Sequence, residues 1–372
     1  MVGVVTPLSA QVSLSSPHKD FCGRLKWSPD GVISNPVLRL YGFGRLDLQR
    51  QTLFNDGTTD SSLISGRGSK IGIKVRRNKR CDDWNVNSRM EFDFRNGTQA
   101  KPRPRLRCAY VEAKNKNRWA LLAGQYYDAW YISSPTLLAS VYPVNRRPQV
   151  RLTKITEFEN RTRLTARVAA VKNQSNNIDE AHANENSEIK RSLLQSAVIL
   201  ERPWLTKRAA RIALTGSYGR ESCNFRDLPE ADGTYDTCLI MINGRLPLCE
   251  RFTAGSALYS GENIDTYFLG GAAKGINCSH GRKIKGAGGW AQGTYYYSPD
   301  CRFNAGYSFL NLQTRWLEPG DRSLYECYSA NTVYFLRPDL QLVLGGNYFI
   351  EEQMHSASRK HARIQCSIYY FF

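Results

Sequence analysis

The chain has 372 residues, a net charge of +18 and a mean hydropathy of −0.46. No stretch approaches the roughly 18 consecutive apolar residues that a membrane-spanning helix needs, so a helical membrane protein is excluded. Tyr (20), Phe (15) and Gly (29) are abundant, and this composition suits twisted β-strands better than a helical core. The positive charge points first to nucleic acid, but no zinc-finger spacing, RNP-type aromatic box or basic helix accompanies it. Nucleic acid is therefore not a predicted partner.

Residues 1–35 contain no convincing strand or helix. The opening MVGVVTPLSAQ has a short apolar run and a small residue at Ala10, but it lacks a positively charged start. The segment is predicted to be a remnant signal peptide or a lead-in to the first strand.

The first clear strand is VLRLYGFGRLDLQ, which alternates with a period of two. Leucines and glycines occupy one face, whereas Arg39, Tyr41, Arg45 and Asp47 share the other. Several charges on one face are costly in a dry core unless they are paired. They are normal in a water-filled lumen, and a soluble strand with a solvated polar face is the alternative.

The next segments continue as short strands with one long interruption. Residues 50–90 are polar apart from KIGIKV; SRMEFDFRNG, RLRCAYVEA and RWALLAGQYYDAW then alternate, and the last two form a predicted hairpin. The Pro-containing segment 127–147 does not alternate, and long loops of this kind are usually functional or disordered. In RTRLTARVAAV, Arg163 and Arg167 share one face. Residues 101–170 hold 14 Lys/Arg against 4 Asp/Glu, so the positive charge is concentrated here.

From residue 192 onward, short connections containing proline alternate with longer ones. The polar segment 172–193 is an expected exposed loop, and the long connections are predicted at 220–235, 274–286, 311–322 and 351–361. This regularity favours an up-and-down barrel over a sandwich, which mixes hairpins with cross-sheet connections. Of the ten cysteines, Cys223 and Cys238 flank one polar stretch and are candidates for a disulfide. The alternative is that the cysteines are free thiols in small apolar positions.

The C-terminal residues form the most regular strand. Ile364, Cys366, Ile368, Tyr370 and Phe372 fall on one face of ARIQCSIYYFF, and the other face becomes polar away from the end. Free ends normally fray, whereas a strand that closes a barrel must stay ordered to its last residue. A terminal aromatic ring also suits the aromatic girdle at a membrane surface.

These motifs resemble the trimeric porins of Gram-negative outer membranes, in the branch associated with small carboxylates, and related outer-membrane proteins. The resemblance is carried by LYGFGRLDLQ, EFDFRNG, WALLAGQYYDAW, LYSGENIDTYFLGG and ARIQCSIYYFF, and it covers about residues 36–372. It implies an all-β, closed antiparallel transmembrane barrel of about 16 strands that assembles as a homotrimer in the outer membrane. It also implies a loop folded into the lumen, here near 127–147. The spacing agrees, because 337 residues at roughly 21 per strand and connection give about sixteen strands.

The function predicted is passive diffusion of small hydrophilic, anionic solutes through a water-filled lumen, with no catalysis, cofactor or metal. Guanidinium groups stay charged and bind carboxylates or phosphates bidentately, so arginines on lumen faces would favour anions. Asp47 and acidic residues of the inserted loop would supply the opposing side of a transverse field. The predicted pore-lining residues are Arg39, Arg45, Asp47, Arg107, Arg151, Arg163 and Arg167. Two other functions remain open: a secreted soluble β module that binds glycans, and an enzyme built on an outer-membrane barrel.

Overall fold

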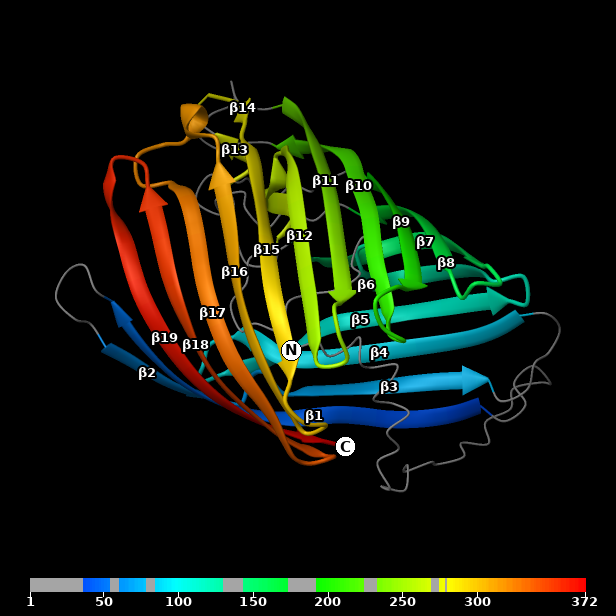
Figure 1. Cartoon of the computed structure of the whole chain (residues 1–372). Helices are drawn as coiled ribbons and strands as arrows, with labels where there is room; N and C mark the ends of the chain where they lie inside the picture. Colours follow the sequence, from blue (N-terminus) through cyan, green and yellow to red (C-terminus); the bar gives the residue numbers. More distant parts are fainter. Residues whose placement is uncertain are drawn as a thin grey trace.

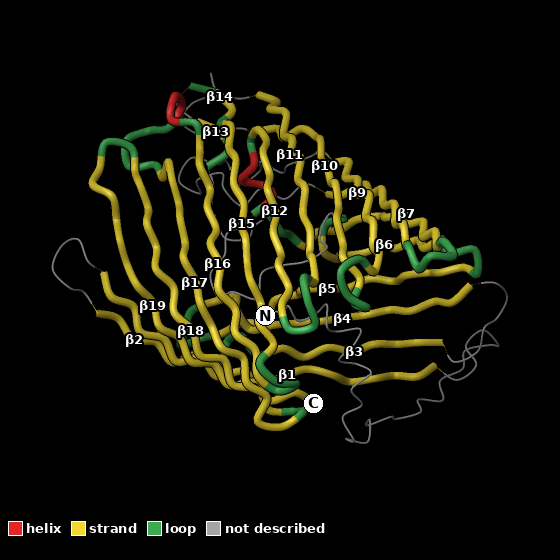
Figure 2. The backbone as a smooth tube through the Cα atoms, in the orientation of Figure 1, coloured by secondary structure: helices red, strands yellow, loops and turns green. Residues whose placement is uncertain are grey.

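The computed structural model is a single closed ring of antiparallel strands (Figure 1). The structure describes residues 36–53, 60–77, 84–129, 143–172, 192–223, 233–268, 274–277 and 280–372. Yellow strands dominate the backbone in Figure 2, with two short helical turns in red, η3 (Ile264–Tyr267) and η4 (Thr314–Trp316). No helix in the described ranges is long and apolar enough to cross a membrane.

Each strand pairs with the next along the chain, and β1 pairs with β19 to close the ring. β2 and β3 both pair with β1, end to end, so together they act as one strand interrupted by a bulge and the barrel has 16 strands. The predicted closed up-and-down barrel is confirmed. The strands are β1 (Pro36–Leu53), β2 (Asp60–Ser65), β3 (Lys70–Arg77), β4 (Trp84–Gly97), β5 (Pro102–Asn115), β6 (Trp119–Tyr127), β7 (Arg146–Glu157), β8 (Arg163–Lys172), β9 (Ser192–Pro203), β10 (Ala209–Cys223), β11 (Gly233–Pro247), β12 (Phe252–Glu262), β15 (Lys285–Tyr296), β16 (Cys301–Leu312), β17 (Arg322–Arg337), β18 (Leu340–Gln353) and β19 (Ser356–Phe371). A separate small hairpin joins β13 (Ile276–Asn277) and β14 (Arg282–Lys283).

The C-terminal strand is ordered to its last residue. The amide of Gly42 donates to the carbonyl oxygen of Phe372 at 3.0 Å, and the amide of Phe372 donates to Gly42 at 3.1 Å. In Figure 1 the red end of the chain runs alongside the blue first strand, where this pairing completes the ring. The alternation that predicted a closing strand therefore corresponds to an actual seam between β19 and β1.

Burial along the strands is inverted relative to a soluble protein. The outward face is apolar and exposed, and the inward face is polar and buried. This pattern is expected when the outside meets lipid and the inside faces a lumen. A soluble glycan-binding module would not leave such a belt in water. Belt residues include Leu40, Leu46, Leu48, Ile73, Leu152, Val198, Leu214, Ile240, Ile242, Leu258, Leu344, Ile364 and Ile368.

A charge placed in this belt should destabilise the barrel. Leu344, near the middle of β18, is 54% exposed. Leu344→Arg is expected to cost about 2–4 kcal/mol of folding free energy if the site lies near the bilayer midplane. Urea unfolding in lipid vesicles measures this, with Leu344→Ala as the uncharged control. Equal losses from Arg and Ala would contradict a lipid-facing position.

The connections form two classes at opposite ends of the barrel. The described short connections are 98–101, 116–118, 158–162, 204–208, 248–251, 297–300, 338–339 and 354–355. All of these except 98–101 and 354–355 lie at the end where Pro36 begins and Phe372 ends. At the other end lie 98–101, 354–355 and the strand ends that flank the long connections 128–145, 173–191, 224–232, 263–284 and 313–321. We refer to these as the short-turn end and the long-loop end.

Two sequence-based expectations about connections were wrong. Residues 351–361 are not a long loop, because β18 and β19 run through them and only Met354 and His355 separate the strands. Residues 50–90 hold three strand segments and the start of a fourth in place of one strand. In both cases the residues are polar because they line the lumen or reach beyond the membrane, so polarity did not mark a loop. The long connection predicted at 274–286 does lie between two barrel strands, largely within the connection 263–284, which also contains the short strands β13 and β14.

The proposed disulfide between Cys223 and Cys238 does not form. Cys238 is a free thiol, and its partner across the strand pair is Tyr218, five residues from Cys223. Cysteines so far apart in register cannot be bridged.

The predicted N-terminal segment, residues 1–35, and the middle of the predicted inserted loop, residues 130–142, lie outside the described ranges.

Candidate functional site: the charged wall of the lumen

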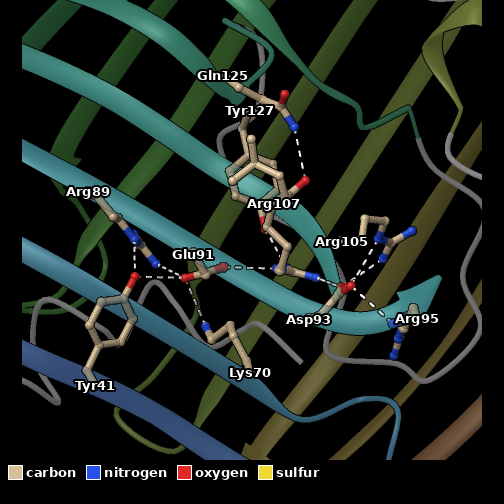
Figure 3. A network of polar contacts seen from close by, with 11 residues as sticks. Tyr41, Lys70, Arg89, Glu91, Asp93, Arg95, Arg105, Arg107, Gln125 and Tyr127 are labelled. Carbon is tan, nitrogen blue, oxygen red and sulfur yellow. Dashed lines mark hydrogen bonds and ion pairs between the residues drawn. The ribbon is translucent and has the colours of Figure 1, made fainter. Parts of the chain in front are cut away.

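The inward faces of β1, β3, β4 and β5 place charged side chains in adjacent rows. Phe43 of β1 is opposite Lys70 of β3, which is opposite Asp93 of β4, which is opposite Arg105 of β5. Because cross-strand neighbours share a face, these side chains all project into the lumen. The rows are the structural basis of a continuous charged network (Figure 3).

Glu91 of β4 is the first of two buried carboxylates in this network, with 1% of its surface exposed. Arg107 donates from Nε to Oε1 at 2.9 Å, and the other oxygen, Oε2, accepts from Arg89 and from the Tyr41 hydroxyl at 3.0 Å. Lys70 lies 3.4 Å from the same oxygen. Figure 3 shows these groups, from β1, β3, β4 and β5, converging on Glu91.

Asp93 is the second carboxylate and is equally buried. Arg105 binds it bidentately at 2.8 and 3.0 Å, and Arg107 reaches it from Nη1 at 2.7 Å. Arg107 therefore bridges both acids, and its remaining Nη2 donates to the Tyr127 hydroxyl at 3.2 Å. Four cations surround two carboxylates, so the network keeps a net positive charge.

Two local backbone features allow this packing. The register between β4 and β5 shifts at Arg107, so that Arg107 is an extra residue opposite Glu91 and Phe92. A β-bulge of this kind re-aims a side chain, here toward the acids of β4. At Gly72, an added Cβ would lie 2.6 Å from the ring and hydroxyl of Tyr41. The glycine thus leaves the space through which Tyr41 reaches Glu91.

Aromatic rings contact most of the neighbouring cations. We call the inward face of β1, β3, β4 and β5, with this network, the cationic wall. Lys74 lies 4.4 Å from the ring centre of Tyr41, Lys70 lies 5.0 Å from that of Phe43, and Arg45 lies 5.0 Å from that of Tyr369. Cation–π contacts of this geometry orient the side chain without cancelling its charge. The wall therefore combines fixed geometry with positive potential.

The structure separates the seven predicted residues by their partners. All lie on the inward faces of β1, β5, β7 and β8, but they do not form one cluster. Arg45 donates to Asp47 at 2.6 Å, and Arg107 belongs to the network of Figure 3. Arg167 donates to the carbonyl oxygen of Ala129 at 3.1 Å. Arg39 and Arg163 are exposed near the short-turn end, and Arg163 lies 3.8 Å from Glu201.

Arg151 differs from the others because its guanidinium stacks on an aromatic ring. It lies 5.2 Å from the ring centre of Tyr126, and within the described ranges no carboxylate forms an ion pair with it. Arg302 over Phe335 at 5.8 Å and Arg363 over Phe349 at 5.2 Å have the same arrangement on β16 and β19. Neither of these two was predicted. The inward-facing cations without an acidic partner are the ones that carry charge into the lumen.

The acidic residues do not lie across the lumen from the arginines. Asp47 is two residues from Arg45 on the same strand, where Ser367 and Gln365 also donate to it at 2.6 and 3.1 Å. The expectation that Asp47 supplies an opposing negative side does not match this placement, because an alternating strand puts residues i and i+2 on one face.

The wall formed by β15–β18 carries a row of neutral hydrogen-bonding side chains beside Arg302. On β15, β16 and β17, Thr294 donates to the side chain of Asn304 at 2.8 Å, and Asn304 donates to Asn331 at 2.7 Å. Ser329 donates to Asn347 of β18 at 2.8 Å. Charged groups are therefore dense on β1–β5, whereas on β15–β18 neutral hydrogen-bonding side chains lie beside Arg302.

No family model matches the chain, and a search of curated proteins finds no match. Solved structures do match over nearly the whole chain. The outer membrane channel DcaP of Acinetobacter baumannii has a TM-score of 0.72 at 17% identity, covering 92% of this chain and 99% of that one. An anion-selective porin from Comamonas acidovorans has a TM-score of 0.58 at 10% identity, covering 91% and 100%. OmpT of Vibrio cholerae, solved in a trimer form, has a TM-score of 0.56 at 11% identity, covering 91% and 99%.

The chain has the porin fold. The fold that the strand motifs imply is thereby confirmed. Identities this low establish the fold alone, so the location and the solute have to be argued from the residues of this chain. In the part of the chain that the structure describes, no group of three or more His, Cys, Asp or Glu residues is placed to hold a metal ion.

The sequence analysis did not identify the carboxylates that organise this network. In SRMEFDFRNG, alternation puts Glu91 and Asp93 on the face opposite to Met90 and Phe92, which is the lumen face in the structure. The signal that could have found the network is the matching periodicity of Arg105 and Arg107 on the following hairpin strand. Their pairing could not be read, because it depends on the bulge at Arg107.

Proposed function

We propose that this porin passes small hydrophilic anions by passive diffusion, and that it assembles as a homotrimer. The observation that carries the proposal is the excess of positive charge on the described inward faces: four cations surround two acids in the network of β1–β5, and Arg151, Arg302 and Arg363 lie over aromatic rings. Fixed charges that line a pore select ions of opposite sign. The names of the Comamonas porin and of DcaP, a channel, support a channel and not an enzyme. OmpT, in its trimer form, supports the assembly.

The position of the loop near 127–147 is part of the proposal. Its described ends, Asp128, Ala129, Val144 and Asn145, are buried. The amide of Asp128 donates to the carbonyl oxygen of Asn145 at 3.1 Å, so the loop leaves and re-enters the wall at one point. This supports a loop that folds inward.

Single-channel recording in a planar bilayer under a salt gradient tests ion preference. The expected zero-current potential has the sign of anion preference, and insertions in groups of three are expected for a trimer. A potential that indicates cation preference would contradict the proposed selectivity but would still support a channel. Absence of any channel from well-folded protein would sink the channel itself.

The arginines without acidic partners should set the magnitude of the preference. Removing one unit charge about 10 Å from a permeating ion changes its energy by about 0.4 kcal/mol in water, or about twofold in local concentration. Arg151→Gln with Arg302→Gln is therefore expected to reduce the anion-to-cation permeability ratio several-fold. Arg202→Gln is the matched control, because Arg202 is exposed on the outward face of β9. A similar reduction from the control would show that the lumen arginines are not responsible.

A further inference from the structure

One part of the inner wall is apolar, which a uniformly water-filled lumen does not explain. On the long-loop half of β8–β16, inward residues such as Leu239, Met241, Tyr259, Leu310 and Leu312 belong to one buried hydrophobic cluster. At Leu239–Ile242 both faces of β11 are apolar, because Ile240 and Ile242 face lipid. An apolar inner wall needs an apolar partner inside the barrel.

The partner is the connection between β12 and β15. Its residues Ile264, Tyr267, Phe268 and Ile284 are fully or almost fully buried members of the same cluster. The ring of Phe268 contacts that of Tyr259 edge-on, with centres 5.6 Å apart. We call the described residues of this connection, 263–268, 274–277 and 280–284, the lumenal plug.

The wall is shaped to receive the plug. A Cβ added at Gly286 of β15 would lie 2.5 Å from Cδ1 of Ile264, and one added at Gly261 would lie 2.8 Å from its Cγ2. Two glycines on neighbouring strands thus form the recess that Ile264 occupies. On β11, the Thr237 hydroxyl donates to the carbonyl oxygen of Asn263 at 2.8 Å and lies 3.0 Å from the Tyr267 hydroxyl.

The plug is also anchored at its other end and across the barrel. Lys274 donates to Glu318 at 3.0 Å and to Asp321 at 2.7 Å in the connection between β16 and β17. Burial alone would lower the pKa of Lys274, but the two carboxylates outweigh it and leave the pKa above its ordinary value, so the anchor is charged at neutral pH. Toward β7, the guanidinium of Arg147 lies 5.6 Å from the ring centre of Tyr267.

We infer that the lumenal plug is a second constriction, which closes the β8–β16 side of the lumen and confines solutes to the cationic wall of Figure 3. The plug matters for ion selectivity because the charges of the cationic wall act only over a short distance in salt solution. The Debye length is about 8 Å at physiological ionic strength. Ions that crossed on the far side of a 16-stranded lumen would be screened from Glu91, Arg107 and their neighbours, and would pass without selection. The plug removes that path.

The inference rests on the proposed channel function and is tested by removing the plug. β12 and β15 pair directly, with Glu262 opposite Lys285, so residues 264–283 can be replaced by a two-residue Asn-Gly hairpin turn. Ile264→Asp is the second variant, since a carboxylate does not fit the apolar recess. Phe158→Asp is the matched control, because Phe158 is an exposed apolar residue in the β7–β8 turn.

Single-channel conductance and zero-current potential are measured for each variant in the same salt gradient. The deletion is expected to raise conductance, because it opens the β8–β16 side of the lumen to ions, and to lower the anion-to-cation ratio. Ile264→Asp is expected to shift both in the same direction, and the control neither. If the native porin is an anion-selective channel and the deletion leaves both quantities unchanged, the plug is not a constriction. If the native protein forms no channel, the proposed function fails first.

Discussion

Glu91→Gln is expected to make the proposed channel more anion-selective and the barrel less stable. The carboxylate is bound by Arg89, Arg107, Lys70 and the Tyr41 hydroxyl in a buried position. Losing its charge adds one positive unit to the lumen, so anions become more favoured and cations less. The three cations then repel one another without the negative charge that Glu91 supplied. Breaking a buried pair of this kind costs about 3–5 kcal/mol.

Zero-current potentials and thermal unfolding in detergent report the two effects separately. Glu352→Gln is the matched control, because Glu352 is an exposed residue on the outward face of β18 and carries the same chemical change. A shift toward cations, or no shift, would mean that permeating ions do not pass within reach of Glu91. An unchanged unfolding temperature would mean that water in the lumen replaces the carboxylate.

The barrel itself could be predicted because its period of two is imposed by two different solvents. Ile364, Ile368 and Tyr370 face lipid, and Gln365 and Ser367 face the lumen, so the contrast in the sequence is strong. The same contrast at β1 placed Arg39, Arg45 and Asp47 on the inner face. The side of a strand on which a side chain lies depends on neighbouring positions in the sequence, so a local pattern predicts it.

Pairing could not be predicted, because it depends on register between strands. That Arg107 contacts both acids of β4 follows from a bulge, which no alternation encodes. That Asp47 is bound by Gln365 and Ser367 follows from the closure of the ring, which joins residues more than 300 positions apart. The excess of Lys and Arg in the sequence therefore predicts where the cationic wall lies. It does not predict which of these charges form ion pairs.

The plug was missed although the sequence contains a trace of it. At Leu239–Ile242 the alternation of polar and apolar residues disappears, since every residue is apolar. On a barrel strand this marks a stretch where the inner face is also dry. The polar connection 274–286 was taken for an external loop because its charged residues, such as Lys274 and Lys283, form ion pairs around the apolar residues of the plug.

The buried ion pair between Asp128 and Arg147 is the site where a single change should cost the most. Both side chains have 0% exposure, and they lie 3.2 Å apart. Gln195 of β9 donates to Asp128 at 3.0 Å and accepts from the amide of Ala129 at 2.9 Å. The pair thus ties the ends of the 128–145 connection to the wall, and Arg147 also stacks on Tyr267 of the plug.

Arg147→Met is expected to destabilise the barrel by about 3–5 kcal/mol, because it leaves the Asp128 carboxylate buried without its ion-pair partner. Urea unfolding in vesicles measures the loss. Asp128→Asn alone should cost less, since the amide retains an acceptor oxygen for Gln195.

The double variant distinguishes the pair from its surroundings. Residues that interact directly give a double variant less damaged than the two single losses predict, because the second change removes the group that the first left stranded. Arg147→Met with Asp128→Asn should therefore unfold at a higher urea concentration than Arg147→Met alone. If it unfolds at a lower one, the stacking of Arg147 on Tyr267, and not its charge, holds the connection in place.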